Sequence, residues 1–189
     1  MKQVMRLAML VSGLLGPVLA YAAPAKDPSG VWLTEDRRAR IQIEMCGAGR
    51  DQVCGYVVWM DKPLNDQGQP KTDRNNPDPA KAKRSVLGHQ LMMGLKANDD
   101  GRYEGEIYNN EDGKKYDVTV WLDKPGQLKV KGCLVAFLCS TQNWTKTADI
   151  ASGQLTGPAG SATGPHPEAG WATAPSTASA APAHARPKP

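Results

Sequence analysis

The stretch GVWLTEDRRARIQIEMCG, residues 30–47, carries the clearest structural signal in this 189-residue chain. Its second half alternates strictly, with Ile41, Ile43 and Met45 on one face and polar side chains on the other. A period of two predicts a β-strand with one buried face. Its first residues, Gly30-Val31-Trp32, form a Gly-x-Trp at the start of a short apolar run. The stretch therefore predicts two strands near the beginning of the folded part.

The same pattern continues along the chain and predicts eight strands in total. Turn-forming sequences, NDDG, EDGK and DKPGQ, join the later strands. No segment of ten or more residues has a convincing helical period. Short antiparallel strands with one buried face predict an all-β sandwich or an up-and-down barrel. The six further strand segments are VCGYVVWM (53–60), GHQLMMGLK (88–96), RYEGEIYN (102–109), KKYDVTVWLD (114–123), QLKVKGC (127–133) and STQNWTKT (140–147).

The position of the Gly-x-Trp favours the barrel. It resembles the first strand of lipocalin-like (calycin) folds, where the Trp closes one barrel end beneath a basic residue from the last strand. The resemblance implies that Trp32 and Lys146 form this plug through a cation–π contact.

The ordered motifs also resemble the bacterial exported family called domain of unknown function 2147 (DUF2147). The resemblance covers about residues 28 to 147 and rests on GVWLTEDRRARIQIEMCG, VCGYVVWM, DRNNPDPAKAKRSVLG, GRYEGEIYNNEDGKKYDVTVWL, LKVKGCL and STQNWTKT. It implies a periplasmic or secreted setting and an eight-stranded antiparallel lipocalin-like barrel. It implies no established activity.

The two ends of the chain differ in composition from the middle. A basic start, an apolar run over 7–19 and the site Ala20-Tyr21-Ala22 predict that residues 1–22 are a cleavable signal peptide, not a membrane span. No cysteine follows closely, so a lipoprotein is not expected. Residues 27–148 form the predicted barrel domain. Residues 149–189 are rich in Ala, Pro, Gly, Ser and Thr, and we expect a disordered tail.

Charge and cysteines restrict the possible partners. The net charge of +4 falls to about +2 without the leader, which is too small and too mixed in sign to predict nucleic-acid binding. Four cysteines in an exported chain predict two disulfides, and the spacing favours Cys46–Cys54 and Cys133–Cys139. A zinc site is the weaker alternative, because no C-x-x-C occurs and His89 is the only histidine in the domain. We expect no metal site.

The long connection over residues 61–86 is expected to form a lid over one barrel mouth. Asn76 and the proline after it read as a helix N-cap and first helical position, with Asp78 in the first turn, which predicts a short helix from 77 to about 83. Asp73 and Asn75 are expected to bond local backbone, and Arg84 to pair with Asp73 or Asp78. The spacing does not fit an EF-hand, although another cation site using Asp73 and Asp78 stays open.

The barrel interior is the expected ligand site. Side chains of one parity point inward, with polar anchors among them. The alternative is a solid core in which these groups bond one another. The expected ligand-binding residues are His89, Tyr103, Tyr116, Gln142, Trp59 and Met93.

No catalytic motif is present, so we expect neither an enzyme nor a cofactor. The sequence therefore predicts an exported protein that binds a small, largely apolar molecule in its barrel. The alternative is a solid barrel whose loop and tail bind an envelope protein partner.

Overall fold

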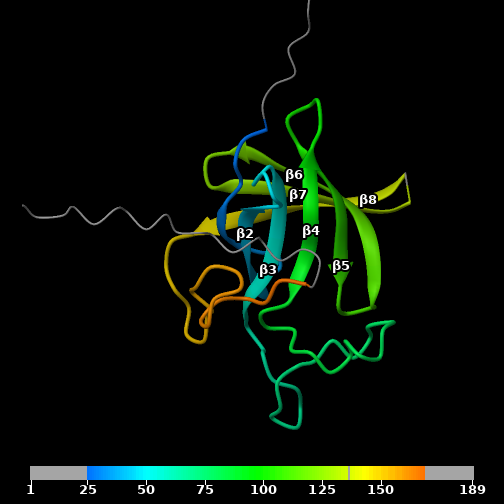
Figure 1. Cartoon of the computed structure of the whole chain (residues 1–189), viewed down its shortest axis with the longest axis vertical. Coiled ribbons are helices and arrows are strands. Elements are labelled where there is room, and N and C mark those ends of the chain that lie inside the picture. Colours follow the sequence, from blue (N-terminus) through cyan, green and yellow to red (C-terminus); the bar gives the residue numbers. More distant parts are fainter. Residues whose placement is uncertain (1–24, 136, 169–189) are drawn as a thin grey trace, which may run out of the picture.

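The computed structural model describes residues 25–135 and 137–168, which contain eight β-strands and no helix (Figure 1). Residues 1–22, the expected signal peptide, lie outside the described residues. No described segment is a helix long and apolar enough to cross a membrane. The strands are β1 (Gly30–Leu33), β2 (Ala39–Cys46), β3 (Gln52–Met60), β4 (Gln90–Ala97), β5 (Tyr103–Asn109), β6 (Lys114–Lys124), β7 (Gln127–Val135) and β8 (Leu138–Thr147).

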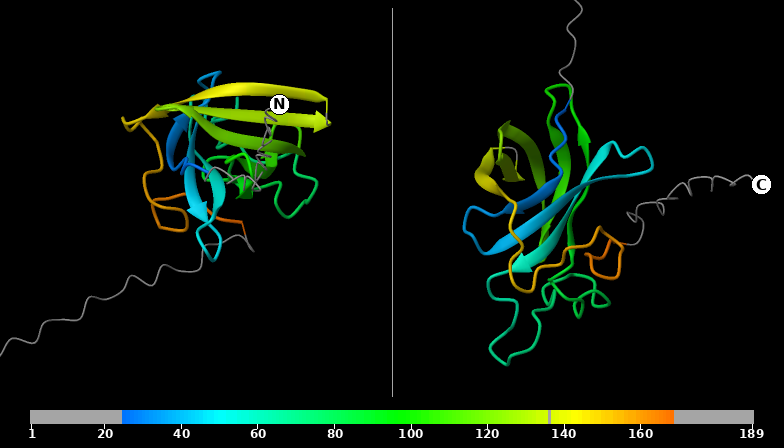
Figure 2. Two further views of the ribbon diagram at one scale, coloured as in Figure 1. Left: turned by 90° about the horizontal axis from the view of Figure 1, so that it is seen from above. Right: turned by 90° about the vertical axis from the view of Figure 1, so that its left-hand side faces the viewer.

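The strands form a closed up-and-down barrel. Each strand pairs antiparallel with its neighbour in sequence, and β1 pairs with β8 to close the ring (Figures 1 and 2). Gly101 and Gly113 supply the positive φ of the turns after β4 and β5, both 71°. The expectation of an eight-stranded antiparallel barrel is confirmed.

Side chains of the inward faces fill the barrel with one hydrophobic cluster. Most of the side chains that alternation placed inside are there, because a one-sided sheet fixes which parity is buried. The buried members are Trp32, Ile41, Ile43, Val53, Val57, Leu91, Met92, Leu95, Tyr103, Val118, Val120, Leu128, Val130 and Trp144.

Two expected interior residues lie elsewhere, because β-bulges reverse the parity. In β3, Arg40 of β2 pairs with Trp59 while Ile41 pairs with Val57, so Val58 is an extra residue. Trp59 therefore points outward: its Nε1 donates to the Ser152 carbonyl at 3.1 Å, and the Arg40 guanidinium lies 5.5 Å from its ring centroid.

Strand β4 carries similar irregularities. Its register shifts against both β3 and β5, and Gly94 adopts φ 68°. Met92 is fully buried in the core, whereas Met93 is only half-buried and outside the cluster. Gly55 on β3 lies opposite Met92 and makes room for the Met92 side chain, since a Cβ at Gly55 would come within 3.0 Å of the Met92 sulfur.

The connection over 61–86 contains turns, so the expected helix over 77–83 is wrong. The Asn76 side chain accepts from the Asp78 N–H at 2.9 Å, as a cap would, but the Asp78 carboxylate then accepts from the Ala80 N–H at 2.9 Å. Such side-chain bonds offer the backbone an alternative to a helix. Bridges between Thr72 and Ser85 and between Leu64 and Pro70 fold the connection back on itself.

The expected disordered tail is also wrong over residues 149–168, while residues 169–189 lie outside the described part. The segment runs along the outer wall of the barrel: the Leu155 N–H donates to the Val58 carbonyl at 2.9 Å, and the His166 N–H to the Gly88 carbonyl at 2.8 Å (Figure 2). The tail has few apolar residues of its own, but the barrel wall supplies it with hydrogen-bond acceptors and an apolar surface. These contacts offset the entropy that the tail loses when it is ordered.

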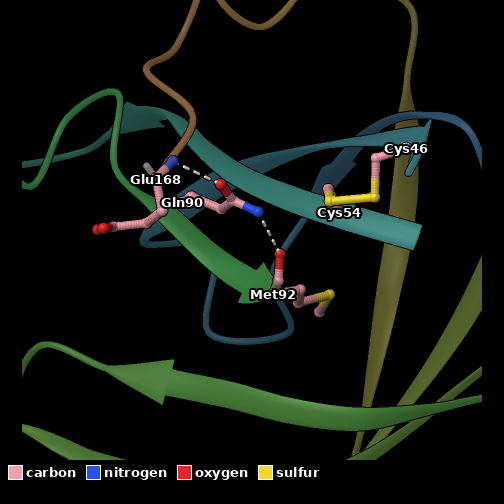
Figure 3. The surroundings of a disulfide bond; sticks show 5 residues. All are labelled: Cys46, Cys54, Gln90, Met92 and Glu168. Atoms are coloured by element: carbon pink, nitrogen blue, oxygen red, sulfur yellow. Dashed lines mark hydrogen bonds between the residues drawn. A yellow bond between two sulfur atoms is a disulfide. The ribbon is translucent and has the colours of Figure 1, made fainter. Parts of the chain in front are cut away.

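Both expected disulfides, Cys46–Cys54 and Cys133–Cys139, are present. The segment over residues 149–168 covers the first of them. Cys46 and Cys54 are fully buried on the outer side of the wall, and Ala159 packs on them with Tyr56. Nearby, Gln90 donates to the Met92 carbonyl and accepts from the Glu168 N–H (Figure 3).

Candidate functional site

A pocket of about 610 Å³ lies at one mouth of the barrel. Three connections bound it: the β1–β2 turn, the long connection after β3 and the β5–β6 turn. These connections meet there because strands of an up-and-down barrel alternate in direction, so every second turn falls at the same end. Loop residues form much of the lining, so the long connection flanks this mouth of the barrel.

The pocket has an apolar floor and a polar rim. Ala39, Val57, Met60 and Val86 contribute the apolar lining. Val57 belongs to the barrel core and is 6% exposed, so the floor of the pocket is the upper surface of that core. The arrangement suits a molecule with a small apolar part and several hydrogen-bonding groups. The polar lining residues are Thr34, Asp36, Arg38, Asp61, Asn65, Asp66, Lys71, Thr72, Arg74, Asn75, Asn109, Asn110, Glu111 and Gln142.

Charges of both signs face the pocket. Arg38 lies between two carboxylates, 3.4 Å from Glu111 and 4.0 Å from Asp36. Lys71 and Arg74, on the long connection, form no ion pair with any residue that the structure describes. Two cations on the rim are therefore available to a ligand.

Asp73 anchors the long connection. It is fully buried and accepts from the Tyr108 hydroxyl at 2.6 Å, the Arg84 Nε at 2.9 Å and the Asn76 Nδ2 at 2.7 Å. A buried carboxylate is tolerated when a cation and several donors surround it, and removing a partner is then costly. Burial, together with the hydrogen bond to Asp73, raises the pKa of Tyr108 to about 12.

Asn75 fixes the same connection to the β5–β6 turn. Its Nδ2 donates to the Glu111 carbonyl at 2.7 Å. The backbone carbonyl of Asn75 lies against Gly113, where a Cβ would overlap it. Gly113 is thus needed both for its positive φ and for this close approach.

Arg84 connects the anchor to the C-terminal segment. It forms ion pairs with Asp73, at 2.8 Å, and with Glu168, which also pairs with Lys81 at 3.1 Å. Arg84 Nη2 lies 3.3 Å from His89 Nε2. Arginine can only donate, so this contact requires an unprotonated Nε2. Burial and the neighbouring Arg84 charge lower the pKa of His89 to about 4.

Of the six expected ligand-binding residues, Gln142 lines the pocket. Tyr103 is a buried core residue at the opposite end of β5 from the pocket residue Asn109. Tyr116 is half-buried and donates to the Asp112 carboxylate in the β5–β6 turn. His89 borders a smaller cavity of about 200 Å³ outside the mouth.

The remaining expected lid residues mostly hold the shape of the loop. Asn75 lines the pocket, Arg84 pairs with Asp73 as one of the two expected alternatives, and Asp78 bonds backbone. Among the described residues no group of three or more His, Cys, Asp or Glu side chains is placed to hold a metal. The pocket residues Arg38, Lys71 and Arg74 were not predicted from the sequence. Because neighbouring strands run in opposite directions, the turns that carry these residues could have been assigned to the same end of the barrel.

The opposite end of the barrel is closed. The Trp32 Nε1 donates to the Pro28 carbonyl at 2.9 Å, and the Lys146 Nζ lies 5.5 Å from the Trp32 ring centroid and donates to the Ser29 carbonyl at 3.1 Å. A Cβ at Gly30 would come within 2.7 Å of the Lys146 side chain, so glycine makes room for the lysine. This arrangement is the plug that the Gly-x-Trp resemblance implied.

A closed eight-stranded barrel with a Trp–Lys plug at one end and a pocket at the other defines a lipocalin-like protein. The chain belongs to the DUF2147 family, described as uncharacterized proteins conserved in bacteria, whose model matches residues 30–146. Two disulfides in a member of a bacterial family fit an oxidising, extracytoplasmic compartment.

A solved structure shares this fold. It is described as protein HP1028 from the human pathogen Helicobacter pylori, which belongs to the lipocalin family. The match has a TM-score of 0.54 and 22% sequence identity, and it covers 65% of this chain and 84% of that one. No curated protein matches the sequence.

Proposed function

We propose that the protein is an exported binding protein that holds a small amphipathic molecule at the barrel mouth. The observation that carries this proposal is the pocket of about 610 Å³, which has an apolar floor on the core and a rim where Lys71 and Arg74 form no ion pair with described residues. Its volume falls within the roughly 300–1,000 Å³ typical of small-molecule sites. Binding without chemistry is proposed, and no cofactor is invoked.

The site differs from the expected one in depth and polarity. Side chains fill the interior with a continuous cluster, so the ligand sits above the core instead of within it. Val57, Met60 and Val86 would contact its apolar part, and Lys71 and Arg74 are placed to bind an acidic group. The proposed ligand is therefore more polar than alternation along the strands predicted.

Native mass spectrometry of gently purified protein tests the proposal. We expect a co-purified small molecule that is lost from Val86→Trp, which fills the floor of the pocket. The matched control is Ile150→Trp, at a residue that is 69% exposed and outside the pocket lining, and it should retain the molecule. Repeated absence of any bound molecule, or equal retention by the two variants, would overturn the proposal.

The alternative is an envelope-partner module, and the filled interior is compatible with it. It predicts that replacing the loop over 61–86 abolishes capture of a protein partner while the barrel stays folded. That result, together with protein that never carries a small molecule, would favour the alternative.

A further inference from the structure

The tip of the β7–β8 hairpin exposes four large apolar side chains. Leu134 is 55% exposed, Val135 46%, Phe137 90% and Leu138 58%. Most large apolar residues of a small exported domain are at least partly covered, and a cluster of exposed ones marks an interaction site. This cluster is separate from the mouth pocket, whose lining includes none of the four.

The hairpin projects from the barrel wall (Figures 1 and 2). Pairing of β7 with β6 ends at Cys133 opposite Asp117, and pairing of β8 with β1 starts only at Thr145. Beyond Cys133 the two strands pair with each other alone, including Val135 with Leu138. The tip is therefore a finger with no neighbouring strand to cover its side chains.

A disulfide clamps the finger at its base. Cys133 and Cys139 face each other across the strands and are bonded. The bond closes a short loop at the base of the tip and so limits the conformations that the hairpin can adopt. The pairing of Val135 with Leu138 also satisfies backbone groups within the hairpin, which favours entry into an apolar environment.

Charge distinguishes the hairpin from the rest of the domain. Residues 127–140, which contain the projecting part of the hairpin, include two lysines and no aspartate or glutamate. Lys131, two residues before Cys133, is exposed, and Lys129 is half-buried on the same face. Asp117 on β6 is the acidic residue paired with the base of the hairpin. An apolar tip followed by lysines matches a surface of acyl chains beneath anionic headgroups.

The size of the tip favours lipid over protein. A specific protein interface buries about 1,000 Å² or more and needs a complementary partner surface, whereas the tip presents four apolar side chains on two strands. Insertion between lipids needs no complementary pocket. We propose that the β7–β8 tip inserts into the surface of a bilayer containing anionic phospholipid, with Phe137 and Leu138 among the acyl chains and Lys131 at the headgroups.

Vesicle co-sedimentation of the protein purified after export tests this. We expect binding to phosphatidylglycerol–phosphatidylethanolamine vesicles and weaker binding to phosphatidylcholine vesicles. Phe137→Ser with Leu138→Ser should weaken partitioning by about tenfold or more, since each loses an apolar side chain from the inserted part. The matched control is Ile150→Ser with Leu64→Ser, whose wild-type residues are 69% and 50% exposed elsewhere, and it should bind as wild type.

A second measurement reports insertion directly. In a Phe137→Trp variant, the emission of the introduced tryptophan is obtained by subtracting the wild-type spectrum. This emission should shift to the blue when vesicles are added, and brominated acyl chains should quench it. No binding to either vesicle, equal loss in the control pair, or no quenching would overturn the proposal. The other outcome is a dimer, seen in sedimentation without vesicles, that is lost when the tip is changed. If the protein also fails to bind vesicles, that result would overturn the proposal and show that the tip binds a second copy of the chain.

Discussion

The two ends of this barrel share the same strands and differ in almost everything else. At the closed end, Trp32 is 1% exposed, its Nε1 donates to the Pro28 carbonyl, and Lys146 covers the ring. At the open end, the turns stand apart around a pocket, and Lys71 and Arg74 form no ion pair with described residues. One end is filled and bonded, whereas the other leaves two cations without ion pairs among the described residues, as the proposed binding site requires.

The long connection shows how the open end is kept in place without being filled. Its anchor, Asp73, lies outside the pocket lining and bonds Tyr108 and Arg84, while Lys71, Thr72 and Arg74 face the pocket. Within a few residues of the same connection, the buried Asp73 stabilises the loop while its neighbours Thr72 and Arg74 face the pocket. Changes at the two ends of the barrel, and at the anchor, should separate stability from binding.

The largest effect is expected at the plug. Trp32→Ala should lower the free energy of unfolding by about 3–5 kcal/mol, because it leaves a cavity at the closed end. The matched control is Trp121→Ala: this half-buried ring lies under Arg102 at 4.5 Å, and its loss should cost about 1 kcal/mol. Denaturant unfolding measures both, and equal costs would contradict a special role for the closed end.

The next largest effect is expected at the anchor of the connection. Asp73→Asn should cost about 2–4 kcal/mol, since it removes a buried carboxylate from Arg84 and two other donors. Trypsin should then cut faster after Lys71 and Arg74. Asp78→Asn, at an exposed position, is the control and should change neither quantity by much. Unchanged proteolysis of Asp73→Asn would show that other contacts hold the connection.

A pH effect of intermediate size is expected from His89. Its pKa is lowered to about 4 in the folded protein, so between about pH 6.5 and 4 the unfolded chain takes up the proton first. Stability should therefore fall as pH decreases through this window, by about 3 kcal/mol, and the loss should level off below it. His89→Gln should flatten this part of a stability–pH curve measured by chemical denaturation. A curve of unchanged slope would assign the acid sensitivity to other groups.

The smallest effect on stability is expected at the pocket rim. Lys71→Ala and Arg74→Ala should each change the free energy of unfolding by less than about 0.5 kcal/mol, because neither side chain is paired in the described structure. Both should nevertheless reduce the amount of co-purified small molecule seen by native mass spectrometry. A large loss of stability in either variant would mean that the open end is not free for a ligand.

Local patterns predicted the parts of the fold that depend on neighbouring residues. Alternation at Ile41 and Ile43 predicted a buried face, the turn sequences predicted the hairpins, and spacing predicted both disulfides. The candidate site was harder, because Trp59 and Met93 lie just beyond bulges that a period of two does not reveal. An extra residue turns the side chain next to it to the other face, and in β4 further irregularities bring Leu95 back to the core.

By itself, the sequence determined the strand series and the disulfide pairs, since each depends on contacts close in the chain or on one repeated pattern. The closed barrel with its Trp plug was implied by the resemblance of the Gly-x-Trp to lipocalin-like folds, because closure pairs β1 with the distant β8. The tertiary structure alone decided that residues 149–168 pack on the outer wall and that Asp73 meets Tyr108. It also decided that the pocket is polar and lies above a filled core. These features depend on residues that are distant in sequence, and their free energy comes from contacts that exist only once the barrel has closed.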